Sequence, residues 1–227
     1  MSHHDNITRI KAVYNALGAL KNEVVFVGGA AVSLYADRRA EETRPTDDID
    51  VIIELWAYKD YAAIDERLRK MGFINDQESG VICRYTVHGI TVDVMPTDDR
   101  ALGFANKWYP SGFASSVDYS LDEETIRIFS SPYFLASKLE AFLNRGRGDG
   151  RTSTDFEDIV FVLENRTIIW EEIDTADEEV RQYLKETFGK LMQDNNFEEW
   201  VDSHAGFGLP PATYFIIDRL EAFTDRK

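Results

Sequence analysis

Apolar and polar positions alternate over the first half of the chain in a way that predicts helices and strands in turn. Apolar residues recur at helical spacing over residues 7–20, and the apolar run 24–27 indicates a short buried strand. Gly28-Gly29 permits a tight turn into a helix with the sequence AAVSLYADR. The run IDVIIEL predicts the next strand, and WAYKDYAAIDERLRKMGF predicts a helix closed by Gly72.

Two β-branched runs follow, at residues 82–87 and 90–94. Only His88-Gly89 separates them, and a two-residue connection containing glycine is typical of a β-hairpin. The hairpin places Asp93 on a strand, flanked by strand-forming apolar residues in the sequence ITVDVMP.

From Ser131 onward the pattern is helical. SPYFLASKLEAFLNRG predicts a helix with a glycine stop, RGRGDGRTS a loop, and Thr154-Asp155-Phe156-Glu157 a capping box that opens a helix to about residue 163. Further helices are expected at about residues 175–193, 195–203 and 210–223. We therefore predict an α/β (α+β) fold: a mixed sheet with flanking helices over residues 1–130, and a helical domain over residues 131–227 that completes a cleft.

Composition narrows the class of protein. The 227 residues are 44% hydrophobic, enough for a core, and 25 basic against 41 acidic residues give a formal charge of −16. That charge opposes general nucleic-acid binding, so a polyanionic partner needs a local basic patch. The single cysteine excludes an internal disulfide, and neither a signal peptide nor a run of about eighteen apolar residues is found. We expect a cytoplasmic protein without a membrane partner.

Two carboxylates, Asp48 and Asp50, interrupt an apolar strand pattern. Side chains two apart on a strand project to the same face, where two anions repel unless a cation lies between them. Oxygen ligands suit Mg²⁺, and with Asp93 on an adjacent strand the three carboxylates could hold two divalent ions roughly 3.5–4 Å apart. The alternative is that Asp48 and Asp50 end a loop on a solvated edge and that Asp93 is an exposed strand residue. The upstream Gly28-Gly29 turn favours the first interpretation, because a strand, a glycine turn and a helix N-terminus attract phosphate.

These motifs together resemble those of the nucleotidyltransferase superfamily of DNA polymerase β. VFVGGAAVSLY, RPTDDIDVII and ITVDVMP match its glycine turn, its Asp-x-Asp pair and its later strand aspartate. The resemblance implies that Asp48, Asp50 and Asp93 are catalytic and bind Mg²⁺ or Mn²⁺. It also implies that Gly28, Gly29 and Thr46 bind the nucleotide.

The helical half resembles the corresponding segment of AbiEii-type nucleotidyltransferases, the toxins of type IV toxin–antitoxin systems. In SPYFLASKLEAFLNRGRGDGRTSTDFEDIVFVL, a helix lysine is followed by an Arg-Gly loop and an acidic helix start. The resemblance implies that Lys138, Asp155 and Asp158 lie near the nucleotide, with Arg145 or Arg147 as the other candidates for phosphate-binding charge. The alternatives are that Lys138 extends to solvent and that the acids merely favour the helix dipole.

The implied reaction is metal-dependent transfer of a nucleoside monophosphate from an NTP to an acceptor hydroxyl. The acceptor is RNA such as a tRNA end, a protein, or a small hydroxyl compound such as an aminoglycoside or lincosamide, and an antitoxin partner is expected. The net charge weakens the RNA option. A competing interpretation is a non-catalytic module that binds nucleotide or a partner protein. The four histidines show no metal-ligand spacing, and His204 is expected to be solvated.

Overall fold

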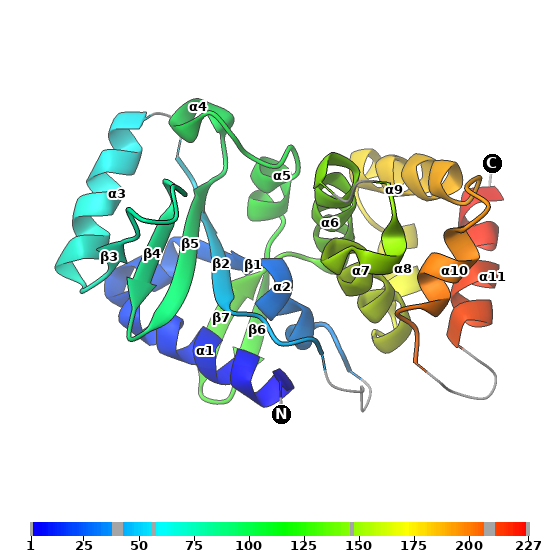
Figure 1. The fold of residues 1–227 in the computed structure, drawn as a ribbon, viewed down its shortest axis with the longest axis horizontal. Coiled ribbons are helices and arrows are strands. Elements are labelled where there is room, and N and C mark those ends of the chain that lie inside the picture. The colour runs from blue at the N-terminus through cyan, green and yellow to red at the C-terminus, as the bar shows by residue number, and fades with distance from the viewer. Residues whose placement is uncertain (1, 38–42, 56–57, 146–147, 207–211, 226–227) are drawn as a thin grey trace. The chain divides into compact units, whose positions relative to one another are not determined.

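The computed structural model describes residues 2–37, 43–55, 58–145, 148–206 and 212–225, and its chain forms two compact units. The first unit comprises Met1–Leu34 and Glu42–Ser130, and the second comprises Tyr35–Glu41 and Ser131–Lys227. An α/β unit is followed by a helical one, which confirms the predicted fold class (Figure 1).

The first unit is built on a seven-stranded mixed sheet in the order β3-β4-β5-β2-β1-β7-β6 (Figure 1). Its strands are β1 (Val24–Val27), β2 (Asp48–Ile53), β3 (Ile74–Asn75), β4 (Arg84–Val87), β5 (Ile90–Pro96), β6 (Val117–Leu121) and β7 (Glu124–Ile128). Strand β2 lies between β5, to which it is parallel, and β1, to which it is antiparallel. The predicted hairpin is confirmed: Val87 faces Ile90, and both His88 and Gly89 have positive φ, as a tight two-residue hairpin turn requires.

The helices of this unit are α1, α2, α3, α4 and α5, with 3₁₀ turns η1 and η2. Their bounds are α1 (Ser2–Ala16), η1 (Gly18–Asn22), α2 (Gly28–Ala31), η2 (Val32–Leu34), α3 (Tyr58–Lys70), α4 (Asp99–Leu102) and α5 (Tyr109–Ala114). The predicted helix AAVSLYADR is shorter than expected, since α2 ends at Ala31 and the 3₁₀ turn ends at Leu34. Val32 and Ser33 are weak helix formers, and the Ser33 hydroxyl is bound to Thr43 at 2.9 Å rather than facing solvent.

The segment from residue 97 to 130 carries structure that the sequence pattern did not predict. Strand β7 lies next to the edge of the sheet, parallel to β1, with Phe26 facing Ile128, and β6 forms the edge beyond it. Only Ile126 and Ile128 are buried within β7, and the first four residues of β6 are not buried. So little apolar alternation gives a weak strand signal.

The second unit contains α6 (Ser131–Arg145), η3 (Gly150–Thr152), α7 (Thr154–Asn165), α8 (Ile169–Asp174), α9 (Glu178–Leu191), α10 (Phe197–Asp202) and α11 (Ala212–Asp225). The helix predicted from Ser131 is confirmed. The capping box was predicted to begin at Thr154, one residue too late. Ser153 is the N-cap of α7, and its hydroxyl accepts a hydrogen bond from the Phe156 amide. Rings of Phe142, Phe156 and Trp200 pack together at centroid distances of 5.2–6.1 Å. The predicted start of the last helix at residue 210 lies outside the described residues.

Within the described part of the chain, no helix combines the length and the apolar character that crossing a membrane requires.

Candidate functional site

The three carboxylates selected from the sequence lie on one face of the sheet. Asp50 of β2 is directly opposite Asp93 of β5, and Asp48 lies two residues earlier on β2. Residues that pair in register, and residues two apart on a strand, project to the same face. The first part of the sequence interpretation is therefore confirmed: Asp48, Asp50 and Asp93 share a face on two neighbouring strands.

These carboxylates are set into the sheet rather than on a solvated edge. Strand β2 is internal, and Asp93 is only 8% exposed, so its interpretation as an exposed strand residue is wrong. Asp48, at the start of β2, keeps 41% of its side chain exposed. The group therefore opens to solvent at the Asp48 end and is enclosed at Asp93.

A cation lies among these carboxylates, and it is Arg84 of β4. Its Nε donates to Oδ1 of Asp93 and its Nη2 to Oδ2 of Asp93, both at 2.8 Å, while Nη2 is 3.5 Å from Oδ2 of Asp48. Register explains the contact, since Arg84 directly faces Asp93 across the β4–β5 pair. The hydrogen bonds to Asp93 raise the pKa of Arg84 above its ordinary value, so the guanidinium stays charged. The sequence pattern did not indicate this residue.

Both glycines after β1 allow charged side chains to approach the backbone closely. Gly28 has φ +73°, and a Cβ placed there would lie 1.8 Å from Oδ2 of Asp50. A Cβ on Gly29 would lie 2.3 Å from Nη2 of Arg44 and 2.8 Å from Cγ2 of Thr46. The Asp50 carboxylate therefore lies against Gly28, and the Arg44 guanidinium lies against Gly29. Helix α2, which begins here, has only four residues, so its dipole is weaker than the predicted helix would have had.

Thr46 is buried and belongs to a polar network below the glycine turn. Its hydroxyl donates to Oδ1 of Asn6 at 3.1 Å, and Nδ2 of Asn6 donates to the Ser33 hydroxyl and to the Arg44 carbonyl, each at 3.3 Å. Arg9 also donates to the Thr46 carbonyl. Helix α1 thus fixes the loop that leads into Asp48.

The second unit holds its own buried charge cluster, centred on Lys138 of α6. Nζ of Lys138 lies 2.6 Å from Oδ2 of Asp158 and 3.2 Å from Oδ1 of Asp155, and all three side chains are at most 7% exposed. Arg145 closes the cluster by binding both oxygens of Asp155 at 2.7 and 2.9 Å. The alternative in which Lys138 extends to solvent is wrong, and Asp155 and Asp158 do more than favour a helix dipole.

The pKa of Asp155 reflects this pairing. Burial acts to raise the pKa, but the Arg145 hydrogen bond and the positive charges of Lys138 and Arg145 outweigh it, so the net shift is downward. Asp155 is therefore ionised at neutral pH. Arg147, the other candidate phosphate-binding arginine, lies outside the described residues.

Comparison with known proteins settles the family. The model of the AbiEii family, described as the nucleotidyl transferase toxin of type IV toxin–antitoxin systems, matches residues 11–205. The chain belongs to the AbiEii nucleotidyltransferase family. The resemblance inferred from the sequence motifs is confirmed, and with it the assignment as a nucleotidyltransferase. A search of curated proteins returns no match.

Solved structures agree with this fold for the AbiEii-family chain. An antigenic nucleotidyltransferase-like protein from Paracoccidioides brasiliensis superposes with a TM-score of 0.55 at 16% identity, over 89% of this chain and 94% of that one. The antibiotic-resistance factor ANT(2'')-Ia superposes with a TM-score of 0.50 at 16% identity, over 85% of this chain and 97% of that one. At this level of identity the likeness shows a shared fold and does not indicate a shared substrate.

Nucleotidyltransferases of this kind generally use divalent metals, and the carboxylate face of this AbiEii-family member meets part of what such an ion requires. Its donors are oxygens on one sheet face, the chemistry that Mg²⁺ and Mn²⁺ prefer. Yet among the described residues no three histidine, cysteine, aspartate or glutamate side chains are arranged to hold an ion. Both oxygens of Asp93 are bound to Arg84. The carboxylate oxygens are the kind of ligand that a divalent ion such as Mg²⁺ prefers. Arg84 is the obstacle, because it already binds both oxygens of Asp93.

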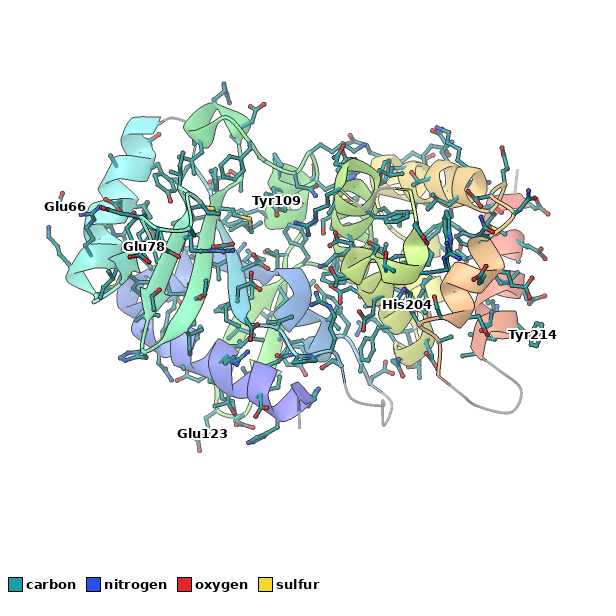
Figure 2. The ribbon with its side chains drawn as sticks, in the orientation of Figure 1. Glu66, Glu78, Tyr109, Glu123, His204 and Tyr214 are labelled. Carbon is teal, nitrogen blue, oxygen red and sulfur yellow. The ribbon has the colours of Figure 1, made fainter. Side chains whose placement is uncertain are left out.

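One prediction about a histidine is corrected by the second unit. His204 (Figure 2) is partly buried: its Nε2 lies 2.8 Å from the Gly150 carbonyl oxygen, and the centroid of its ring lies 6.2 Å from that of Phe156. It therefore packs against η3 and α7 of the second unit.

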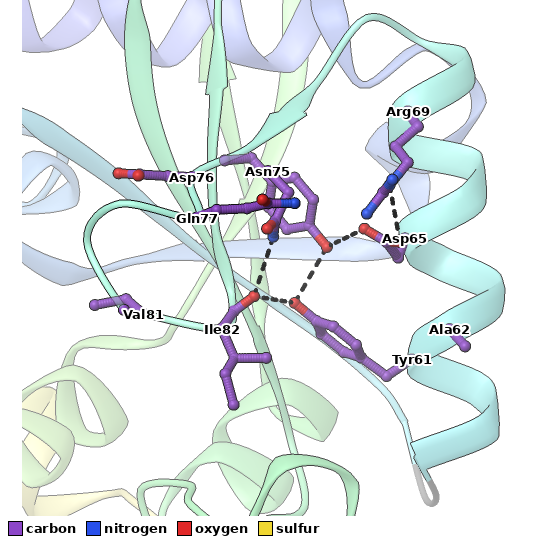
Figure 3. Close-up of a pocket in the computed structure, with 11 residues that line it drawn as sticks. Tyr61, Ala62, Asp65, Arg69, Asn75, Asp76, Gln77, Val81 and Ile82 are labelled. Carbon is purple, nitrogen blue, oxygen red and sulfur yellow. Dashed lines mark hydrogen bonds and ion pairs between the residues drawn. The ribbon is translucent and has the colours of Figure 1, made fainter.

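A pocket of about 390 Å³ lies on the sheet face opposite the carboxylates (Figure 3). Tyr85 follows Arg84 on β4 and so points to the other face, where its hydroxyl donates to Asp65 of α3 at 2.8 Å. Tyr61 lies 3.3 Å from the Tyr85 hydroxyl, and Arg69 pairs with Asp65 at 2.9 Å. These polar groups contact one another on the other face of the sheet, so the pocket is separate from the carboxylate site.

Proposed function

We propose that this enzyme transfers a nucleoside monophosphate from an NTP to an acceptor hydroxyl, using Mg²⁺ or Mn²⁺ held by Asp48, Asp50 and Asp93. The observation that carries the proposal is the shared sheet face of these carboxylates, with Asp50 lying against Gly28. Carboxylates on two adjacent strands next to a glycine turn bring anionic ligands beside backbone amides. That combination suits a metal-bound triphosphate.

Each residue of the first unit has a distinct role in this proposal. Asp48, Asp50 and Asp93 would hold the metal, which when bound would supply positive charge to neutralise the triphosphate and make the acceptor hydroxyl easier to deprotonate. Asp93 accepts the proton of that hydroxyl, whose oxygen forms a bond to the α-phosphorus as the bond to the pyrophosphate oxygen breaks. Backbone amides at Gly28 and Gly29 hold the phosphates, and Thr46 positions the loop that leads into Asp48 and strand β2.

The second unit contributes a cation in this proposal. Lys138 contacts the phosphates, while Asp155 and Asp158 hold its ammonium in place. Arg145 also binds Asp155, so ion pairs hold both cations in position before a phosphate arrives. Arg145 is the more accessible of the two cations, with 70% of its side chain exposed against 7% for Lys138. It therefore shares the phosphate-binding role.

Family membership supports two further parts of the proposal. The family is described as the toxin of type IV toxin–antitoxin systems, so we propose that an antitoxin is the protein partner. The acceptor is an RNA end, a protein hydroxyl or a small hydroxyl compound, and we favour a macromolecule because the family is named for toxins rather than for resistance factors.

The test combines substrate identification with one inactivating substitution. Purified protein is incubated with each α-labelled NTP, Mg²⁺ or Mn²⁺, and separate pools of total RNA, cell protein and aminoglycosides, and released pyrophosphate is measured alongside. One pool should retain label. Asp50→Asn should reduce labelling at least about a hundredfold, because a metal contributes several kcal/mol of transition-state stabilisation.

Asp47→Asn is the matched control. Asp47 adjoins the site, but its side chain is fully exposed and makes only a 3.9 Å ion pair with Arg9, so labelling should be unchanged. Binding of an NTP without pyrophosphate release or labelling in any pool would favour the non-catalytic module instead.

A further inference from the structure

Arg84 binds Asp93, which the proposed function takes as a metal ligand. Its guanidinium binds Asp93 through both oxygens and reaches Asp48 at 3.5 Å, so it connects the enclosed and open ends of the group. Strand pairing fixes its backbone directly opposite Asp93. The side chain itself is 27% exposed, so it is not packed rigidly in the core.

We propose that Arg84 is a competing cation: it neutralises Asp93 and Asp48 when no metal is bound, and a divalent ion must displace it from Asp93 to complete the site. The inference rests on the proposed function, because it takes Asp48, Asp50 and Asp93 as the metal ligands. Arg84 is then a positioning residue that sets the metal affinity of the site.

Charge explains why a competing cation is needed. Three carboxylates converge on one face of a sheet whose opposite face is covered by α3, and without a cation their repulsion would oppose folding. A bidentate guanidinium is the geometry that holds a carboxylate most firmly with a single positive charge. The fork takes one acceptor position on each Asp93 oxygen and holds a positive charge beside both of them. A metal ion on Asp93 is repelled by that charge, so each cation lowers the occupancy of the other.

Displacement also gives Arg84 a second position. Several rotatable side-chain bonds separate its guanidinium from a backbone fixed in the sheet, and Asp48, with 41% of its side chain exposed, marks the open direction. Moved from Asp93 toward Asp48, the guanidinium stays on the face where the proposed function places the triphosphate. Metal binding would therefore release a positive charge toward an anionic substrate.

The decisive measurement is binding of Mn²⁺ alone, by electron paramagnetic resonance, to the unsubstituted 227-residue protein and to Arg84→Gln. Removing the competitor should tighten Mn²⁺ binding roughly tenfold, the scale on which one bidentate charged hydrogen-bond pair acts. Arg84→Lys, which keeps the charge but not the fork, should bind Mn²⁺ with intermediate affinity. In urea unfolding with EDTA, Arg84→Gln should have a lower midpoint than the parent, and Mn²⁺ should narrow that difference.

Arg69→Gln is the matched control, because Arg69 also pairs with an aspartate of the first unit, Asp65, but on the opposite sheet face. It should leave Mn²⁺ affinity unchanged. A purely structural Arg84 would lose metal affinity together with stability, so Arg84→Gln binding Mn²⁺ no better than the parent overturns the inference. If neither protein binds Mn²⁺, or if Asp50→Asn retains the binding, the metal ligands themselves are wrong and the proposed function fails with them.

Discussion

Gly28 is the residue at which backbone conformation and side-chain proximity constrain the site together. Its φ of +73° is costly for any other residue, and Oδ2 of Asp50 occupies the space that a Cβ would need. Gly72, after helix α3, has a similar φ of +90°, but no atom lies within 4 Å of the position that a Cβ would take there. The two glycines therefore separate the cost of strain from the cost of displacing Asp50.

We predict that Gly72→Ala lowers the free energy of unfolding by about 1 kcal/mol and leaves transfer intact, since it adds backbone strain alone. Gly28→Ala should be more destabilising and should reduce transfer at least about tenfold, because the Asp50 side chain must move from the position it holds against Gly28. Urea unfolding and pyrophosphate release measure the two effects. Equal destabilisation with full activity in both variants would show that the contact with Asp50 is unimportant.

Residue-level prediction from the sequence succeeded where it depended on strand alternation and failed where it needed pairing. Alternation alone puts Asp48 and Asp50 on one face. Arg84 was missed because it lies on a different strand, well beyond Asp50 in the sequence, although the predicted turn already implied its position. A two-residue turn at His88-Gly89 makes Val87 face Ile90, and stepping outward along both strands pairs Arg84 with Asp93, as the structure shows.

At the scale of elements, helices α6 and α7 are joined by a buried ionic cluster as well as by apolar packing. Asp155, in the first turn of α7, accepts hydrogen bonds from Lys138 and Arg145 of α6. Buried ion pairs of this kind tie two elements in one register, because breaking one partner leaves another charge unpaired.

The lowered pKa of Asp155 predicts how the stability of this helix pair changes with pH. In the unfolded chain the carboxyl has its ordinary pKa of 3.8, and in the folded chain the pKa is lower. The ionised form therefore contributes stability that is present above the unfolded pKa and is lost as the pH falls through the folded one. Asp155→Asn should cost about 1–3 kcal/mol at pH 7, and the difference from the parent should shrink below about pH 4.

Urea unfolding over a series of acidic to neutral pH values, followed by circular dichroism, measures this dependence. Glu178→Gln is the control, because Glu178 pairs with Arg181 on the exposed surface of α9 in the same unit. Its effect should be near zero throughout. A constant difference between Asp155→Asn and the parent over the whole pH range would mean that the Asp155 charge is not what joins α6 to α7.

Elements were predictable where their signal was local. The helix from Ser131 has strong apolar periodicity and a proline at its second position, and its bounds were recovered. Strand β7 was missed for two reasons. Its place beside β1 depends on a long-range pairing of Phe26 with Ile128, and only two of its own residues are buried, so its apolar alternation is weak. Start signals one residue apart also compete: Ser153 and Thr154 are both good N-caps, and only the bond to the Phe156 amide distinguishes them.

At the scale of the whole molecule, the proposed substrate contacts are divided between two compact units. The proposed metal ligands belong to the sheet of the first unit, whereas Lys138 and Arg145 belong to the helices of the second. Each group is already fixed within its own unit, by strand register in one case and by buried ion pairs in the other. A nucleotide that binds both groups should therefore slow hydrogen exchange in both units.

Hydrogen exchange with NTP and Mg²⁺ tests this division directly, because peptides report on each unit separately. We predict slower exchange in β2 and β5 and also in α6 and α7, with α11 unchanged as an internal control. At a ligand concentration of about 100 times Kd, the protection should approach about 2.7 kcal/mol for amides that exchange only from the unbound state. Asp50→Asn should remove the protection from both units, since metal-bound triphosphate is what engages Lys138. Protection confined to the first unit would exclude Lys138 and Arg145 from the nucleotide site. The phosphates would then be bound by the first unit alone. Its cations would be Arg84, which lies against the carboxylates, and Arg44, which lies against the glycine turn.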